Sequence, residues 1–356
     1  MKETILDALK SAYALDEGQM VANRFGSGHI HKTYKVDGPN KSYILQEFND
    51  TVFKYPERIS NNLGYLLDNF DPAKLPFVLP LPIPNRKGEL FTTLDGGQYR
   101  LFPFVTGLTR DDIEEKEQAE IAAEAFAYFV KIFSKTDPGK LQDTIQDFHN
   151  LEWRYEQFDQ ALKNPTIEID KETEEMIAYY EAQKELLKQF RIYRDQLPLR
   201  ATHNDTKINN LIFSEDLKKV NAVIDLDTIM AGFVFYDFGD LARTVACTRD
   251  ESSLDWGNIH VDMVKYKGLL EGFYTVLAGH ITNKEMDSIP FGAEMMTLIM
   301  GLRFLTDHLM GNVYYQVTYK EQNLHRAKNQ AELLTAFIEK RPEIKALESE
   351  LKKKFL

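Results

Sequence analysis

The chain has 356 residues, and its 43 Lys and Arg against 55 Asp and Glu give a formal net charge of −12. A composition that is 43% hydrophobic and 28% charged is typical of a globular protein and excludes disordered and collagen-like classes. The negative charge argues against binding along a nucleic-acid backbone or on an anionic membrane surface, because both depend on many Lys and Arg contacts.

The N-terminal segment has the spacing of an amphipathic helix through Ile5, Leu9 and Tyr13, without the continuous apolar core of a secretion signal. No stretch approaches the ~20 apolar residues that a membrane-spanning helix needs. The single cysteine, Cys247, excludes an internal disulfide and a Cys-based zinc cluster. We therefore expect a cytoplasmic protein.

Between residues 20 and 105 the segments are short and carry strand and turn signals. Residues 21–36 are predicted to form two strands around the turn Gly26-Ser27-Gly28, and residues 42–48 and 98–105 two more. Residues 57–70 are predicted to form a helix. Five of the thirteen prolines lie between positions 72 and 84, which favours an edge strand or an extended connector.

After residue 106 the apolar spacing becomes helical, first along residues 121–133. The further helices are predicted over residues 173–190, 262–277, 295–310 and 323–340. They are interrupted by a strand-like island at residues 197–201, 210–213 and 220–224.

The strand-rich first part and the helical second part of the chain predict an α+β protein with two lobes joined near residues 102–107. Residues 1–105 would form a small lobe built on an antiparallel sheet, and residues 106–356 a larger, mainly helical lobe. A cleft between two such lobes is where a ligand is expected.

The strand-like island carries the densest cluster of polar residues, His203-Asn204-Asp205-Thr206-Lys207-Ile208-Asn209-Asn210, followed by Val223-Ile224-Asp225-Leu226-Asp227. An Asp, an Asn five residues later and an Asp at the end of the next strand are what phosphoryl transfer requires. Asp205 would accept or orient the proton of an attacking hydroxyl, while Asn210 and Asp225 would hold Mg²⁺ on the phosphates. The alternative is that these residues only cap strands and turns.

Slightly downstream, Asp237-Phe238-Gly239 spells the metal-binding D-F-G of protein kinases. Asp225 is the stronger metal candidate, because it directly follows an apolar strand and lies closer in sequence to Asp205. Asp237 is predicted to brace the catalytic loop or to cap a helix beginning near Leu241. A direct metal role for Asp237 is left open.

The H-N-D-x-x-x-x-N run, the I-D-L-D run and the later Y-D-F-G-D run resemble the aminoglycoside phosphotransferase and choline kinase superfamily. Over nearly the whole chain, the sequence is most similar to the N-acetylhexosamine 1-kinases within it. The runs that carry this closer resemblance are G-S-G-H-I-H-K-T-Y, Y-I-L-Q, T-H-N-D-T-K-I-N-N, V-I-D-L-D-T-I-M, L-R-F-L and G-N-V-Y. The resemblance implies a protein-kinase-like bilobal fold, with ATP as co-substrate and Mg²⁺ as cofactor.

Carried over by motif, the resemblance implies that Asp205 is the catalytic base and that Asn210 and Asp225 are the magnesium ligands. Lys207 would lie near the γ-phosphate, although a solvated loop lysine is the alternative. Arg303 and Tyr314 resemble positions that contact the sugar, with Thr228 and His31 as weaker candidates. The alternatives are an ion-paired helix arginine for Arg303 and a core aromatic for Tyr314.

For the nucleotide, Gly26, Ser27 and Gly28 would approach the phosphates through backbone N–H groups. Phe102, Phe104 and Val105 would hold the adenine through backbone hydrogen bonds. The strand position that usually holds the phosphate-binding lysine of kinases is Gln46, and the helix expected to supply its glutamate partner offers Asn61, Asn62 and Gly64. A lysine–glutamate pair is therefore doubtful.

The resulting hypothesis is a kinase that phosphorylates the anomeric hydroxyl of N-acetylglucosamine or N-acetylgalactosamine. Its partners would be ATP and the sugar, with no nucleic acid and no membrane, and we expect a monomer. One alternative is a kinase of the same superfamily that acts on choline, an aminoglycoside or another amino alcohol. A second is a non-catalytic nucleotide-binding protein with a degenerate kinase fold.

Overall fold

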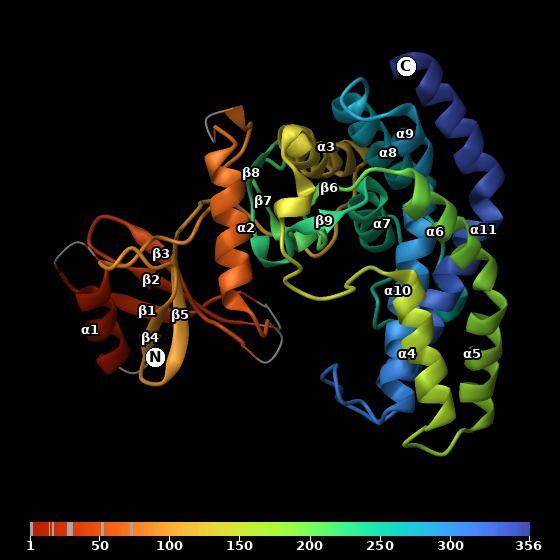
Figure 1. Ribbon diagram of the computed structural model, residues 1–356, viewed down its shortest axis with the longest axis horizontal. Helices are drawn as coiled ribbons and strands as arrows, with labels where there is room; N and C mark the ends of the chain where they lie inside the picture. Colours follow the sequence, from red (N-terminus) through yellow and green to blue (C-terminus); the bar gives the residue numbers. More distant parts are fainter. Residues whose placement is uncertain (1–2, 14, 16–17, 27–30, 51–52, 72–73) are drawn as a thin grey trace.

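The computed structural model describes residues 3–13, 15, 18–26, 31–50, 53–71 and 74–356. A β-sheet with one helix packed on it forms one end of an elongated molecule, and a group of helices forms the other end (Figure 1). We call the part up to the last sheet strand the N-lobe and the part from Lys116 onward the C-lobe. This antiparallel sheet beside a helical body is a kinase-like fold.

The N-lobe sheet has five strands in the order β1-β2-β3-β5-β4, and every neighbouring pair is antiparallel. The strands are β1 (Val21–Arg24), β2 (Lys32–Asp37), β3 (Ser42–Glu47), β4 (Thr92–Leu94) and β5 (Gly97–Pro103). Four of them confirm the predicted strands. The sequence missed β4 because three residues are too few to show alternation. In this register Gln46 on β3 pairs with Arg100 on β5.

Two helices accompany the sheet. Helix α1 (Glu3–Ala12) buries Leu9 against the sheet, together with Tyr13 just beyond its end. Helix α2 (Pro56–Asp68) starts with a proline in its first turn, where the missing N–H costs nothing. It lies between the sheet and the C-lobe (Figure 1).

The proline-rich segment is an extended connector, as predicted. Val78 forms a parallel bridge with Ala222 of the C-lobe, and both of its backbone groups are used: its N–H donates to Asn221 and its carbonyl accepts from Val223. The segment therefore ties the N-lobe side of the chain to the strands that carry the polar cluster.

The C-lobe contains nine long and short helices within the described residues. They are α3 (Lys116–Ile132), α4 (Leu151–Lys163), α5 (Lys171–Ala182), α6 (Lys184–Gln196), α7 (Val234–Val245), α8 (Met263–Leu277), α9 (Asn283–Ser288), α10 (Phe291–Leu309) and α11 (Gln322–Phe355). Two apolar cores hold them, one around α3, α7 and α8 and one around α4, α5, α6 and α10, with α11 contributing to both.

Three predicted helices differ from the structure. The segment 173–190 is two helices, α5 and α6, which meet at Gln183. Helix α7 begins at Val234, so the predicted start near Leu241 is wrong. Helix α11 continues beyond the predicted end at residue 340 and through Pro342. Ile344, Leu347 and Leu351 are buried against the core and offset the hydrogen bond lost at the proline.

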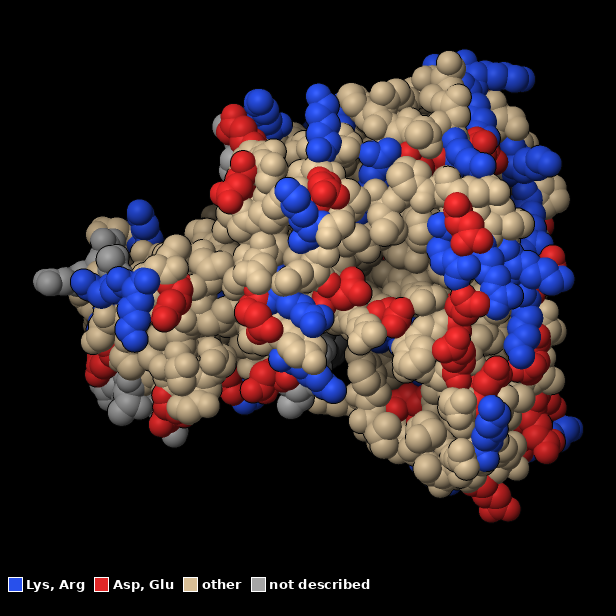
Figure 2. Space-filling model, viewed as in Figure 1, with Lys and Arg blue, Asp and Glu red and all other residues tan. Residues whose placement is uncertain are grey.

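The strand-like island forms two small antiparallel pairs, β6 (Arg200–Thr202) with β9 (Met230–Gly232) and β7 (Leu211–Phe213) with β8 (Val220–Val223). The polar cluster lies in the connections between these strands. Across one face, Lys and Arg gather over the helical end with Asp and Glu among them (Figure 2). In the part of the chain that is described, no helix is both long and apolar enough to cross a bilayer.

Candidate active site

The loop after β6 brings the first predicted residues together. The side-chain amide of Asn210, at the end of a short 3-10 turn (Ile208–Asn210), donates to the Asp205 carbonyl at 2.8 Å and to Asp205 Oδ2 at 3.1 Å. Lys207 Nζ lies 3.3 Å from Asp205 Oδ1. Burial raises the pKa of Asp205, but the Lys207 ammonium and the Asn210 hydrogen bond outweigh it and hold that pKa below its usual value. Asp205 is therefore ionised at neutral pH.

Asp237 braces this loop, as predicted. Its two carboxylate oxygens accept the backbone N–H groups of His203 at 3.0 Å and Asn204 at 2.8 Å, and its carbonyl accepts the Thr206 hydroxyl at 2.6 Å. Because Asp237 lies in the first turn of α7, the helix fixes the loop shape directly. Burial raises the pKa of Asp237 to about 6.

Asn204 is the tightest point of the loop, with φ of 63°. A non-glycine residue in the left-handed region is strained and persists only where its surroundings fix it. Here the Asn204 side chain donates to the carbonyls of Thr202 at 3.1 Å and Thr228 at 3.0 Å, and its own carbonyl contacts His149 Nε2 at 2.7 Å. The Thr228 hydroxyl in turn donates to the His203 carbonyl at 2.8 Å. Thr228, a predicted sugar contact, is thus built into the loop.

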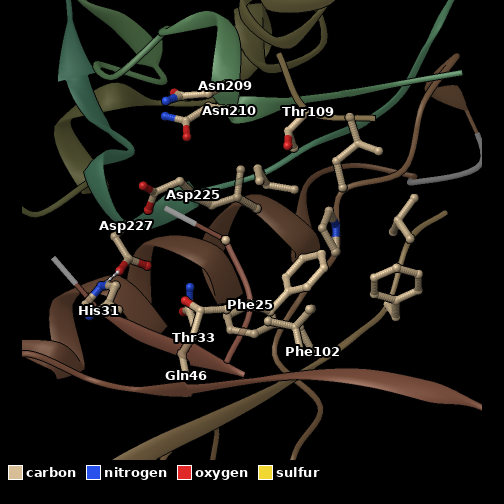
Figure 3. A pocket seen from close by; sticks show the side chains of 18 of the residues that line it. Phe25, His31, Thr33, Gln46, Phe102, Thr109, Asn209, Asn210, Asp225 and Asp227 are labelled. Atoms are coloured by element: carbon tan, nitrogen blue, oxygen red, sulfur yellow. Dashed lines mark hydrogen bonds and ion pairs between the residues drawn. The ribbon is translucent and has the colours of Figure 1, made fainter. Parts of the chain in front are cut away.

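Asp225 follows β8 and enters the short turn Leu226–Thr228 with φ of 61°. Figure 3 shows Asn210 and Asp225 on the C-lobe side of a cavity, with Gln46 and Phe102 on the N-lobe side. Burial, followed by the negative charges of Asp227 and Asp205, raises the pKa of Asp225 to about 7. Burial and negative charge therefore outweigh the opposing effect of His31 and Arg100 on Asp225.

These residues fit a magnesium ion. The amide NH₂ of Asn210 is used by Asp205, which leaves its oxygen for a cation, and Asp225 supplies a carboxylate short of a counter-charge. Among the described residues, no cluster of three or more His, Cys, Asp or Glu converges on a metal position. One carboxylate and one amide oxygen suit Mg²⁺, which commonly takes one or two carboxylates and leaves its other positions to water and substrate phosphates.

The cavity has a volume of about 350 Å³ and is lined from both lobes. Its walls contain most of the predicted catalytic and nucleotide residues: Gly26, Gln46, Phe102, Phe104, Val105, Asp205, Lys207, Asn210 and Asp225. Ser27 and Gly28 lie outside the described residues. The cavity therefore joins the segment predicted to hold adenine to the residues predicted to act on phosphate.

His31 also lines this cavity, but its ring is engaged within the protein. Its Nδ1 accepts the Asn49 N–H at 3.0 Å, so its Nε2 carries the hydrogen and donates to Asp227 Oδ2 at 2.9 Å. The ring also stacks against Phe48 and Phe53. The structure thus places His31 at the contact between the lobes, and its role as a sugar contact stays a prediction.

Arg303 and Tyr314 lie in a second cluster in the C-lobe. The Arg303 guanidinium is 5.3 Å from the Phe148 ring, 5.7 Å from that of Tyr314 and 5.4 Å from that of Tyr315. Asp307, one turn further along α10, accepts the backbone N–H groups of Tyr314 and Tyr315 and fixes both residues there. Tyr314 is 58% exposed, so it is not a core aromatic.

The cluster of Arg303 connects to the catalytic loop. Phe148 lies beneath the guanidinium, and its neighbour His149 holds the Asn204 carbonyl immediately before Asp205. In the described chain no carboxylate forms an ion pair with Arg303, whose hydrogen bond goes to Met300 Sδ at 3.4 Å. The alternative of an ion-paired helix arginine is therefore wrong.

The roles of three residues at the site, Arg100, Asn62 and Asp227, were not predicted from the sequence. Arg100 on β5 forms a buried ion pair with Asp227, and Asn62 on α2 donates to the Ile229 carbonyl at 2.8 Å. Asp227 belongs to the I-D-L-D run, but the sequence did not indicate which residue pairs with it. A lone arginine in a strand carries no signal in the sequence.

Comparison with known proteins supports the kinase interpretation. A profile of the phosphotransferase enzyme family matches residues 21–260. Similar solved structures include spectinomycin phosphotransferase with ADP and spectinomycin, which is 13% identical with a TM-score of 0.56, covering 94% of this chain and 97% of that one. A microcompartment-associated aminopropanol kinase is 14% identical with a TM-score of 0.60, covering 95% and 98%.

Choline kinase from Cryptosporidium parvum Iowa II is likewise 14% identical, with a TM-score of 0.60, and the alignment covers 97% of this chain and 96% of that chain. At these identities the solved structures establish the fold, while the family profile spans most of the chain. The chain shares the fold of these solved structures, and it belongs to the phosphotransferase enzyme family.

Proposed function

We propose that the protein transfers the γ-phosphoryl group of ATP to the anomeric hydroxyl of an N-acetylhexosamine. Asp205, held ionised by Lys207, would orient the hydroxyl and accept its proton as it attacks. Asn210 and Asp225 would hold Mg²⁺, which neutralises charge on the phosphates when bound. Phosphoryl transfer needs mainly positioning and charge neutralisation, and these residues supply both.

The adenine would lie against residues 102–105. Pro103 has no N–H, and the N–H of Phe104 donates to the Ser42 carbonyl at 3.2 Å. Among residues 103–105, only Val105 has an N–H without a partner in the described chain. This N–H can donate to the adenine base. This supports the predicted backbone recognition of the nucleotide.

The observation that carries the choice of acceptor is the Arg303 cluster. A cationic amino alcohol or aminoglycoside would be favoured by carboxylates. Here a guanidinium that forms no ion pair within the described chain stands among the aromatic rings of Phe148, Tyr314 and Tyr315. The positive charge of Arg303 disfavours a cationic acceptor, and its guanidinium donors suit a neutral sugar, whose acetamido carbonyl would accept from Arg303. This agrees with the sequence resemblance to N-acetylhexosamine 1-kinases.

The experiment is an ATP-turnover assay with N-acetylglucosamine, N-acetylgalactosamine, choline and an aminoglycoside as parallel acceptors. The Asp205→Asn variant is the control, since it keeps the side-chain shape and removes the base. We expect turnover with one or both N-acetylhexosamines and none with the cationic acceptors. Turnover with the cationic acceptors alone would contradict the proposal.

A further inference from the structure

A buried ion pair joins the two lobes beside the metal loop. Arg100 on β5 is 1% exposed, and its two terminal nitrogens donate to Asp227 Oδ1 at 2.6 Å and Oδ2 at 2.7 Å. Asp227 is itself buried and stands two residues after Asp225 in the same short turn. The bidentate geometry fixes the carboxylate in both position and orientation.

Two further N-lobe side chains complete this contact. His31 donates a third hydrogen bond to the Asp227 carboxylate, drawn as a dashed line in Figure 3. Gln46, at the strand position where kinases usually carry a lysine, accepts from Arg100 at 2.8 Å. The glutamine thus serves to orient the arginine, and the positive charge at this point of the N-lobe comes from β5.

Aromatic rings seal the ion pair from water. The Arg100 guanidinium lies 4.9 Å from the ring of Phe48, 5.5 Å from that of Phe91 and 5.2 Å from that of Phe102. In such surroundings charges interact strongly, and removing one partner leaves the other buried and uncompensated. The position of Asp227 therefore depends on Arg100.

Helix α2 holds the other end of the same turn. The buried side chain of Asn62 donates to the Ile229 carbonyl at 2.8 Å and to the Gln142 carbonyl at 2.7 Å, and its oxygen accepts the Gln142 N–H at 2.8 Å. In protein kinases the corresponding lysine and glutamate bind each other. Here Arg100 on β5 and Asn62 on α2 each bind the C-lobe instead.

We propose that Arg100 is a positioning residue for the magnesium site, fixing Asp225 from the N-lobe through Asp227 in place of a lysine–glutamate pair. The sheet that covers the nucleotide and the turn that carries the metal ligand would then move as one unit. This inference rests on the proposed function only in taking Mg²⁺ and ATP as ligands; it does not depend on the acceptor.

The test measures binding without any acceptor. Mn²⁺, which is paramagnetic, is titrated into the protein in the presence of ATP and followed by electron paramagnetic resonance, and ATP affinity is measured by calorimetry with and without metal. The variants are Arg100→Gln, Asp227→Asn and the double variant. Arg341→Gln is the control, because Arg341 makes a bidentate pair with Glu294 between α11 and α10, away from the cavity.

We expect Arg100→Gln to weaken Mn²⁺ binding by roughly 10–100-fold, the usual effect of removing a residue that orients a metal ligand. Metal-free ATP binding should change little, and Arg341→Gln should match the wild type in both assays. If Arg100→Gln does not fold, the double variant replaces it, because changing Asp227 to Asn as well leaves no unpaired buried charge. We expect the double variant to show the same loss of Mn²⁺ affinity. Wild-type Mn²⁺ affinity in the folded double variant would overturn the proposal.

Failure of the wild type to bind ATP with metal would overturn both this inference and the proposed function. A wild type that binds both ligands, beside a folded double variant that binds them equally well, would overturn the positioning role alone. The two failures are therefore distinguishable.

Discussion

His149 offers a quantitative test of how the catalytic loop is held. Its ring is buried, its Nε2 must donate to the Asn204 carbonyl, and its Nδ1 has no hydrogen-bond partner in the described chain. Protonation would place a charged, unpartnered N–H in the interior. Burial, reinforced by the nearby charges of Arg303 and Arg154, lowers the pKa of His149 to about 3.

In the unfolded chain the His149 pKa returns to about 6.5, so the unfolded state binds a proton that the folded state excludes. The contribution of neutral His149 to the free energy of unfolding is fully present above pH 6.5 and is lost as the pH falls from 6.5 toward 3. Linkage between these two pKa values gives a loss of about 2 kcal/mol at pH 5 relative to pH 7.5. The variant His149→Gln keeps a donor for the Asn204 carbonyl and does not titrate. The part of the acid-induced loss of unfolding free energy that comes from His149 should therefore vanish in this variant.

The assay is urea unfolding at pH 7.5, 6 and 5, followed by tryptophan fluorescence. Both tryptophans, Trp153 and Trp256, lie in the C-lobe and report on the part that contains His149. The exposed His260 provides the control variant His260→Gln, which should keep the wild-type pH dependence. Equal loss of stability on acidification in the wild type and His149→Gln would refute the reasoning.

Three other variants address chemistry, acceptor binding and packing. Asp205→Asn should lower kcat by roughly 10²–10⁴-fold while calorimetry still detects ATP binding with Mg²⁺; unchanged turnover would exclude Asp205 as the base. Arg303→Ala should raise the KM for the sugar by roughly 10–100-fold, because the sugar loses a charged hydrogen-bond donor. The KM for ATP should be unchanged, and an equal rise in both KM values would contradict a sugar-side role. Gly239→Ala would place a Cβ 2.1 Å from the Gly292 carbonyl oxygen, where α7 meets α10, and should lower the unfolding free energy by about 1–3 kcal/mol or more. Gly257→Ala meets no atom within 4 Å, so equal losses in both glycine variants would refute the packing argument.

The sequence predicted the features that depend on local patterns. Strand alternation and turn residues located β1, β2, β3 and β5, and helical spacing located most of the long helices. Asp237 was correctly predicted to brace the loop, because Asp225 better matched the metal position. Boundaries failed where packing overrides propensity, as at Pro342, where buried residues beyond the proline sustain α11.

Contacts between distant parts of the chain could not be predicted in the same way. Arg100 and Asp227 are 127 residues apart, and neither strand periodicity nor motif spacing indicates that they pair. The sequence likewise did not indicate that the His31 ring contacts the Asn49 N–H and the Asp227 carboxylate. Such assignments need the three-dimensional arrangement, because they depend on which side-chain nitrogens remain available.

The central claim is phosphoryl transfer from ATP to the anomeric oxygen of an N-acetylhexosamine. The most direct measurement is phosphorus NMR of the product formed from ATP, Mg²⁺ and N-acetylglucosamine or N-acetylgalactosamine, with coupling to the anomeric proton as the diagnostic signal. We predict a sugar 1-phosphate that is absent when Asp205→Asn replaces the wild type. A phosphate attached at another hydroxyl, or no sugar phosphate with either acceptor, would contradict the account.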